Sequence, residues 1–272
     1  MTVGTSSASP ATDGGAAIMV RALLLRGMTA GVVAGLAYFV FAYLFGEAAV
    51  DGAIAYENSS TAAAHGASGE PPLVSRGIQS TVGLGAAAVL YGVVIGGLLA
   101  LVYAAVVGRV GRLSPRATAA VIAVVGFVAV AAVPFLKYPA NPPASTVDST
   151  VGQRTGPFVA LIIISVALMV GAVLMQRSLS ARLGTWNATL TAAGAYVAAA
   201  GIAGFLLPTV DETPADFPAT VLYDFRLASI GGQVVLWAVV GLVFGALVDK
   251  RSKRPTGTPA GAGLQGGTSR SS

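Results

Sequence analysis

The chain has 272 residues, of which 55% are hydrophobic and only 10% are charged, and its mean hydropathy is +0.78. This composition excludes an ordinary water-soluble domain and indicates a membrane protein. The absence of cysteine excludes disulfides, thiolate nucleophiles and thiolate metal sites. The net charge of +5 does not indicate nucleic-acid binding, because the basic residues flank apolar stretches, where membrane insertion and anionic headgroups explain them.

Six apolar stretches follow one another along the chain, and each has the length that a helix needs to cross the hydrocarbon core. They cover residues 23–45, 81–107, 117–136, 155–175, 186–207 and 227–248, and apart from Arg26 near the start of the first they contain no Lys, Arg, Asp, Glu or His. We therefore predict an all-α, polytopic membrane protein with six transmembrane helices in residues 20–250. The flanking segments 1–19 and 251–272 are predicted to be disordered cytoplasmic tails, because they are polar and rich in small residues.

The charged residues alternate between the two sides of the predicted bundle. Twelve of the 16 Lys and Arg residues fall near the two ends of the chain, at Arg21 and Arg26 and from Lys250 onward, and in the second and fourth connections. Since basic loops stay cytoplasmic, both termini are predicted to lie inside, in a multi-pass protein of the cell membrane. Nine of the 11 acidic residues fall on the opposite side. This acidic excess is not part of the orientation rule and therefore needs another reason.

The first outer connection, residues 46–75, contains candidate metal ligands. Glu47 and Asp51 are four residues apart and share one face if the chain stays helical beyond the membrane. Glu57 and His65 follow, and carboxylates and imidazole suit Co²⁺ or Ni²⁺. On a straight helix, however, Glu47 and His65 are about 27 Å apart, so they share an ion only if the chain folds back. Two hypotheses stay open here, namely cation capture and a solvated polar stripe.

The second and third outer connections are stiffened by prolines. The segment 137–143 is predicted to form a rigid, extended lid over the second helical hairpin. In the third connection, Asp211, Glu212 and Asp216 could form a second acidic mouth that holds a cation. The same acids fit a solvated turn in which Asp216 caps the next helix.

Each outer connection ends with an arginine where the returning helix begins, namely Arg76, Arg154 and Arg226. These side chains could snorkel to lipid headgroups, or they could tie the acidic loops over the helix mouths. We expect the first role for Arg76, and the second for Arg226, which follows Asp224 by two residues. Either role fits Arg154. Together the three arginines are the candidates for electrostatic organisation of the acidic mouth.

Catalytic signatures are missing from the sequence. No phosphate-binding loop precedes any lysine, so we expect no ATP binding, and His65 has no plausible nucleophile partner, so we expect no enzymatic activity. No permanently bound cofactor is expected. Apart from Arg26 near the start of the first, the predicted spans also lack the Lys, Arg, His, Asp and Glu residues that most ion pathways carry. An ion would have to use opened backbone carbonyls, a path shared with another subunit, or the intramembrane polar groups Tyr38, Tyr91, Tyr103, Met169, Thr189, Thr191 and Gln233.

The outer connections contain specific strings of residues. They include Gly46-Glu47 with Val50-Asp51-Gly52-Ala53-Ile54, Val74-Ser75-Arg76-Gly77-Ile78, Lys137-Tyr138-Pro139-Ala140-Asn141-Pro142-Pro143, and Asp216-Phe217-Pro218-Ala219 with Phe225-Arg226-Leu227-Ala228-Ser229. These strings are spread over the part of the chain that contains all six predicted helices. In them the chain resembles the CbtA family of predicted cobalt transporter subunits.

This resemblance implies an integral-membrane subunit of a cobalt uptake system that transports Co²⁺, with a small single-helix companion, CbtB. Family members often carry a His cluster in the first outer loop, where this chain has only His65. That departure shifts metal capture toward the companion. The alternative is a non-transporting membrane scaffold or assembly factor that binds a partner through its outer loops. Convergence of Glu47 and Asp51 on the third outer loop would favour a metal mouth.

Overall fold

The structure is a computed structural model that describes the backbone of residues 11–65, 75–109, 113–143, 145, 151–210 and 213–252. Side chains are described for residues 17–60, 75–109, 113–143, 145, 154–210 and 213–249. Within these ranges the chain is helical and contains no strand, which agrees with the predicted all-α class. The helical elements are α1 (Ala11–Phe45), α2 (Glu47–His65), α3 (Arg76–Ile78), η1 (Gln79–Gly83), α4 (Leu84–Val106), α5 (Pro115–Gly126), η2 (Phe127–Ala132), α6 (Val133–Lys137), α7 (Val151–Leu206) and α8 (Ala219–Ser252).

Five helices in the described part of the chain are long and apolar enough to cross a membrane. They cover Ala17–Phe45, Arg76–Val106, Pro115–Lys137, Arg154–Leu206 and Ala219–Asp249. The fourth has 53 residues, which as a straight helix would measure about 80 Å, far more than the roughly 30 Å hydrocarbon core. Two of the six predicted spans, 155–175 and 186–207, lie within it.

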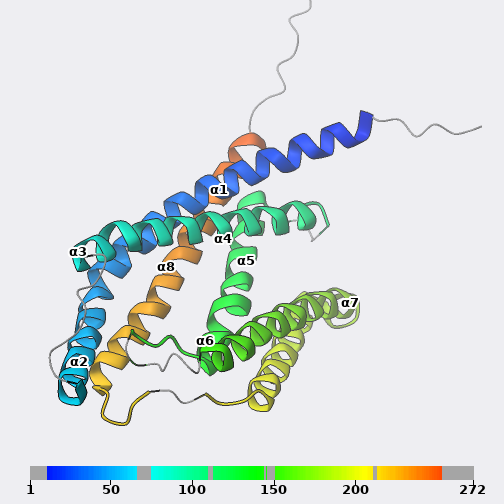
Figure 1. Cartoon of the computed structure of the whole chain (residues 1–272). Helices are drawn as coiled ribbons and strands as arrows, with labels where there is room; N and C mark the ends of the chain where they lie inside the picture. The colour runs from blue at the N-terminus through cyan, green and yellow to red at the C-terminus, as the bar shows by residue number, and fades with distance from the viewer. Residues whose placement is uncertain are drawn as a thin grey trace, which may run out of the picture.

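The helix α7 folds back on itself at Gly184. This glycine has φ 74° and ψ 160°, a conformation that residues with a Cβ rarely adopt. Figure 1 shows the two arms of α7 lying side by side, and the buried hydroxyls of Ser165 and Tyr196 join them at 2.8 Å. The connection between these two predicted spans is therefore shorter than the sequence suggests, since residues up to 183 stay helical and one glycine makes the turn. Six membrane passes remain a prediction.

The core is built on a close crossing of α1 and α4. Gly27, Gly31 and Gly35 of α1 face Ala88, Gly92 and Gly96 of α4, backbone against backbone. A Cβ added to Gly31 would lie 2.2 Å from the carbonyl oxygen of Gly92. Small residues permit such an approach, and packing of this kind drives helix association in lipid. α8 packs on both α1 and α5, and its side chains Leu236, Val240 and Phe244 are fully buried.

Two stretches of π-helix interrupt the apolar helices. η1 leads into α4, and η2 separates α5 from α6 within one continuous span. A π-bulge widens the helix and weakens its internal hydrogen bonding, and such bulges occur often at functional sites. No pattern in the sequence predicts either stretch.

The helices extend further than the sequence predicts. α1 begins at Ala11, inside the segment 1–19 that was predicted to be a disordered tail. The first outer connection is also largely helical, because α2 starts directly after Gly46 and runs to His65. Residues 1–10 and 253–272 lie outside the described part of the chain.

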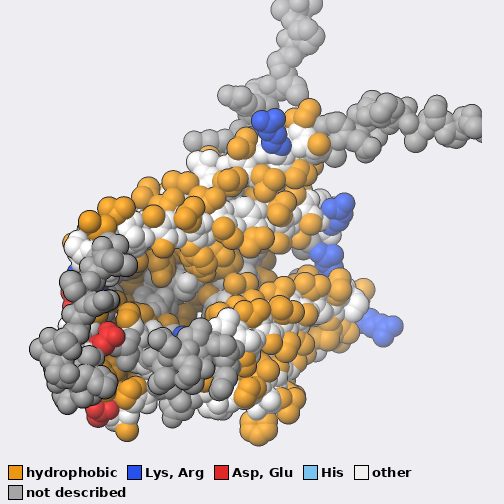
Figure 2. Space-filling view, viewed as in Figure 1, with side chains coloured by type: hydrophobic (Ala, Val, Ile, Leu, Met, Phe, Trp, Pro, Cys, Tyr) orange, Lys and Arg blue, Asp and Glu red, His pale blue; other side chains and the backbone are white. Residues whose placement is uncertain are grey.

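The charged side chains gather at the two ends of the bundle. Figure 2 shows the basic groups at one end and the acidic groups at the other, beside α2. We name the first the basic end, with Arg21, Arg26, Arg109, Arg116, Arg177 and Arg182. The second is the acidic end, with Glu47, Asp51, Glu57, Asp216 and Asp224. At the basic end, Arg116 Nε donates to the buried carboxylate of Asp249 at 2.9 Å and ties α5 to α8.

Substitution of Gly31 tests the α1–α4 crossing. Gly31→Ala is expected to destabilise the protein by about 1–3 kcal/mol, because the new methyl group overlaps the α4 backbone. The measurement is the thermal unfolding midpoint in detergent. Gly171→Ala in α7 is the control, because its Cβ meets nothing within 4 Å and alanine favours a helix. Equal midpoints for the two variants would contradict the crossing.

Candidate functional site

The first candidate group at the acidic end is a three-residue ion cluster formed by Glu47, Asp51 and Arg76. Arg76 Nε donates to Asp51 Oδ1 at 3.0 Å, and Arg76 Nη2 donates to Glu47 Oε2. The side chain of Glu47 is 18% exposed, whereas that of Asp51 is 64% exposed. The i, i+4 spacing places both acids on one face of α2, as predicted. Arg76, expected to reach the headgroups, instead bridges the two carboxylates.

This cluster carries a formal charge of −1. A divalent cation that binds both carboxylates competes with Arg76 for them, because the guanidinium contacts one oxygen of each acid. Among the described side chains, no three His, Asp or Glu groups lie close enough to hold a metal ion. A complete site therefore needs ligands from elsewhere.

The other predicted ligands lie apart from this cluster or outside the described side chains. Glu57 is exposed on α2, and Asp216 lies in the third connection. The side chain of His65 is not among those described, and Asp211 and Glu212 lie outside the described residues. Whether these three join the cluster stays a prediction.

The helix α2 packs against the third connection and the start of α8. Tyr56 donates its hydroxyl hydrogen to Asp216 Oδ1 at 2.9 Å, and its ring meets that of buried Phe217 edge-on at 4.9 Å. The side chain of Val221 in α8 packs against Gly52 of α2. The first and third connections therefore converge, although through Tyr56 rather than through a shared cluster of described carboxylates.

Hydrogen bonds to the third connection and to α8 hold the proline-rich segment 137–143 in place. Tyr138 is buried and donates to the carbonyl oxygen of Pro208 at 2.7 Å, and Lys137 Nζ donates to Thr209 Oγ1 at 3.1 Å. Arg226 Nη2 donates to Asn141 Oδ1 at 2.8 Å, and its Nε lies 3.4 Å from the carbonyl oxygen of Ala140. Arg226 thus ties down the second connection through neutral oxygens, a role for which its nearness to Asp224 gave no signal.

Beneath this segment lies a central cavity of about 710 Å³. α1, α4, η2, α7 and α8 all contribute to its wall, and Tyr138 and Ala140 cover it at the acidic end. Tyr38, Tyr91 and Gln233, three of the predicted intramembrane polar groups, line it, and the Tyr91 hydroxyl donates to Gln233 Oε1 at 3.2 Å.

The cavity has further polar lining residues. Thr155 and Ser229 were not among the predicted intramembrane polar groups, whereas Arg154, a charged lining residue, was predicted to organise the acidic mouth. Met169 and Thr189, which were predicted as intramembrane polar groups, line a different cavity, and Tyr103 is buried against Phe244. These residues lie on separate helices, so only the packing of the helices decides which of them share one cavity.

The contact between Tyr56 and Asp216 gives α2 a pH-dependent attachment. The hydrogen bond to Asp216 raises the pKa of the Tyr56 hydroxyl above its ordinary value. Its stabilising effect is therefore complete below the ordinary pKa of about 10 and is lost as pH rises through the raised value.

We expect the thermal midpoint of the protein to fall above about pH 10 by more than that of the Tyr56→Phe variant, which has no proton to lose there. The measurement is the midpoint in detergent between pH 8 and 11. Asp216→Asn serves as the control, since it keeps an acceptor oxygen without the charge. Identical pH profiles for all three proteins would show that the contact does not attach α2.

Comparison with known proteins places the chain in a family. No curated protein and no solved structure matches it. A family model described as "Probable cobalt transporter subunit (CbtA)" matches residues 20–249, which covers most of the chain and all five apolar helices. The chain is therefore a membrane protein of the CbtA family of probable cobalt transporter subunits.

Proposed function

We propose that this protein is the membrane subunit of a cobalt uptake system and that its acidic end faces out of the cell. It would cross the cell membrane six times, with both termini in the cytoplasm, and act with a single-helix CbtB companion. Its substrate would be Co²⁺, with Ni²⁺ as the neighbouring candidate, because carboxylate and imidazole ligands suit both ions. The family described as cobalt transporter subunits is the starting point of this proposal.

The observation that carries the proposal is the central cavity. It places the polar groups of Tyr38, Tyr91 and Gln233 between apolar helices. Buried polar groups are costly in a bilayer and therefore mark pathways. The cavity also borders η2, and π-helical stretches of this kind occur often at functional sites. A cation could exchange its water for the oxygens of Tyr38, Tyr91 and Gln233 without an ionisable residue.

The cluster at Glu47 and Asp51 would be the first stop of the cation. Arg76 stands in for the cation in the empty state, so it keeps two carboxylates close together at low cost in repulsion. An arriving Co²⁺ would replace Arg76, with further ligands from Glu57, His65, Asp211, Glu212 or Asp216, or from the companion. Arg154 and Arg226 would organise the acidic end, the latter by holding the segment over the cavity.

The alternative function is a membrane scaffold that binds a partner through its outer connections. The observation in its favour is that Arg76 already satisfies Glu47 and Asp51. In that case the cluster would only fasten α2, and no cation would enter.

Uptake of ⁵⁷Co²⁺ by cells with and without this chain separates the two functions. Deletion is expected to abolish the uptake that depends on the system. Glu47→Gln and Asp51→Asn should each raise the Co²⁺ concentration for half-maximal uptake about tenfold, the effect of losing one charged ligand. Asp224→Asn, which removes an exposed carboxylate at the same end, is the matched control.

Uptake that survives deletion would reject transport and favour the scaffold. Equal effects of Asp51→Asn and Asp224→Asn would reject the cluster as the entry point. Surface expression is measured in parallel, so that a folding defect is not read as lost transport.

The cavity is tested by substitutions that leave the acidic end intact. Gln233→Leu and Tyr91→Phe remove polar atoms with little change in volume, and each should lower the maximal uptake rate several-fold with little change in half-saturation. The physical reason is the same for both variants, because each removes a side-chain oxygen from the proposed path. Tyr223→Phe, at a residue that is 64% exposed, should leave uptake unchanged. Normal maximal rates in both cavity variants would remove the cavity from the route.

A further inference from the structure

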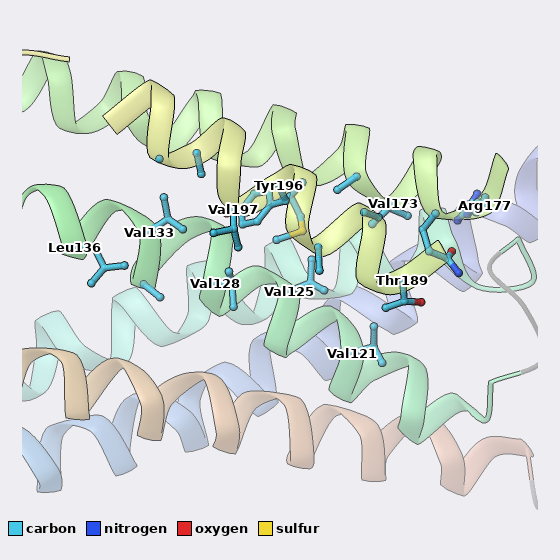
Figure 3. A pocket seen from close by; sticks show the side chains of 18 of the residues that line it. Val121, Val125, Val128, Val133, Leu136, Val173, Arg177, Thr189, Tyr196 and Val197 are labelled. Atoms are coloured by element: carbon cyan, nitrogen blue, oxygen red, sulfur yellow. The ribbon is translucent and has the colours of Figure 1, made fainter. Parts of the chain in front are cut away.

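A second, larger cavity lies between α5, η2 and α6 on one side and the two arms of α7 on the other. Its volume is about 1280 Å³ (Figure 3). It exists because α7 packs on the bundle mainly through η2 and α6, so its arms stand away from α5 toward the basic end. We call this cavity the α7 groove. It is separate from the central cavity, and the proposed cation route does not use it.

The middle of the α7 groove is apolar. Val121, Val125 and Val128 come from one wall and Val173 and Val197 from the other (Figure 3). Water does not fill such a space, because it finds no polar partners there. Within a bilayer, the apolar molecules that surround the protein are lipid acyl chains.

Polar groups gather at one end of the α7 groove. Arg109, Gln176, Arg177, Ser180 and Thr185 line the basic end, whereas Lys137 is the polar lining residue at the other end. Figure 3 shows Arg177 and Leu136 at opposite ends of the apolar walls. The groove therefore has a cationic head and an apolar stem. Arginine binds phosphate through paired hydrogen bonds, and basic pockets between transmembrane helices bind anionic lipid headgroups.

The two ends of the groove differ in the same way as the two parts of an anionic phospholipid. From its apolar stem and its cationic head, we propose that the α7 groove binds one anionic phospholipid. The phosphate lies between Arg109 and Arg177, and the acyl chains run along the valines of α5 and α7.

Native mass spectrometry of the full chain tests this site. The detergent-purified protein is delipidated and offered phosphatidylglycerol and phosphatidylcholine together. The wild-type protein is expected to retain the anionic lipid preferentially. Each of Arg109→Gln and Arg177→Gln should weaken its binding about fivefold, the effect of one basic residue near an anionic headgroup. Arg182→Gln is the matched control, because it removes an exposed charge from the same helix outside the groove.

Gly201→Leu provides a second, independent arm. Gly201 lines the groove, and a Cβ there meets nothing within 4 Å, so the larger side chain fills the groove without a clash. It should reduce the binding of both lipids, whereas the arginine variants reduce only that of phosphatidylglycerol. Thermal midpoints confirm that the variants fold.

Three results would overturn the proposal. One is an equal loss of lipid in the Arg182→Gln control, which would indicate general surface charge. Another is equal retention of both lipids by the wild-type protein. The third is a dimer that Gly201→Leu converts to monomers with no change in bound lipid, which would make a second copy the occupant.

Discussion

The backbone-to-backbone crossing of α1 and α4 determines where the acidic end is assembled. The two helices run antiparallel and meet at Gly31 and Gly92. Glu47 follows Gly31 by 16 residues, and Arg76 precedes Gly92 by 16 residues. Measured from the crossing toward the acidic end, the same helical length of about 24 Å therefore separates Gly31 from Glu47 and Gly92 from Arg76, so the acid and the arginine lie at the same level. The ion cluster thus depends on two glycines deep in the membrane-spanning part, and not only on the residues that form it.

The same geometry gives Arg76 two roles that are difficult to separate by inspection. An arginine between two carboxylates stabilises their proximity, and it also competes with any other cation for them. The cluster is partly exposed, so solvent and salt screen its ion pairs and keep the exchange of one cation for another inexpensive. A fully buried cluster would bind its arginine too firmly for exchange. Partial exposure of Asp51 would therefore be a requirement for the proposed capture, and it limits the contribution of the ion pair to stability.

Local periodicity and charge predicted much of this molecule, and tertiary packing decided the remainder. The apolar stretches, the separation of charge and the shared face of Glu47 and Asp51 follow from residues close in sequence. The partner of Arg76 is 25 and 29 residues away, and the oxygens that Arg226 contacts belong to a connection about 85 residues earlier. No periodic pattern carries that information. The helical form of residues 177–183 was missed because basic residues after an apolar run resemble a loop.

η2 forms a common wall between the two cavities. Val130 and Ala131 face the central cavity, whereas Val128 and Ala132 line the α7 groove. A π-helical stretch is held less firmly by its own hydrogen bonds than an α-helix, so its position depends more on what packs against it. A lipid in the groove would support η2 from one side and so fix the width of the central cavity on the other. Through this shared element, an anionic lipid would influence a cation route that it never contacts.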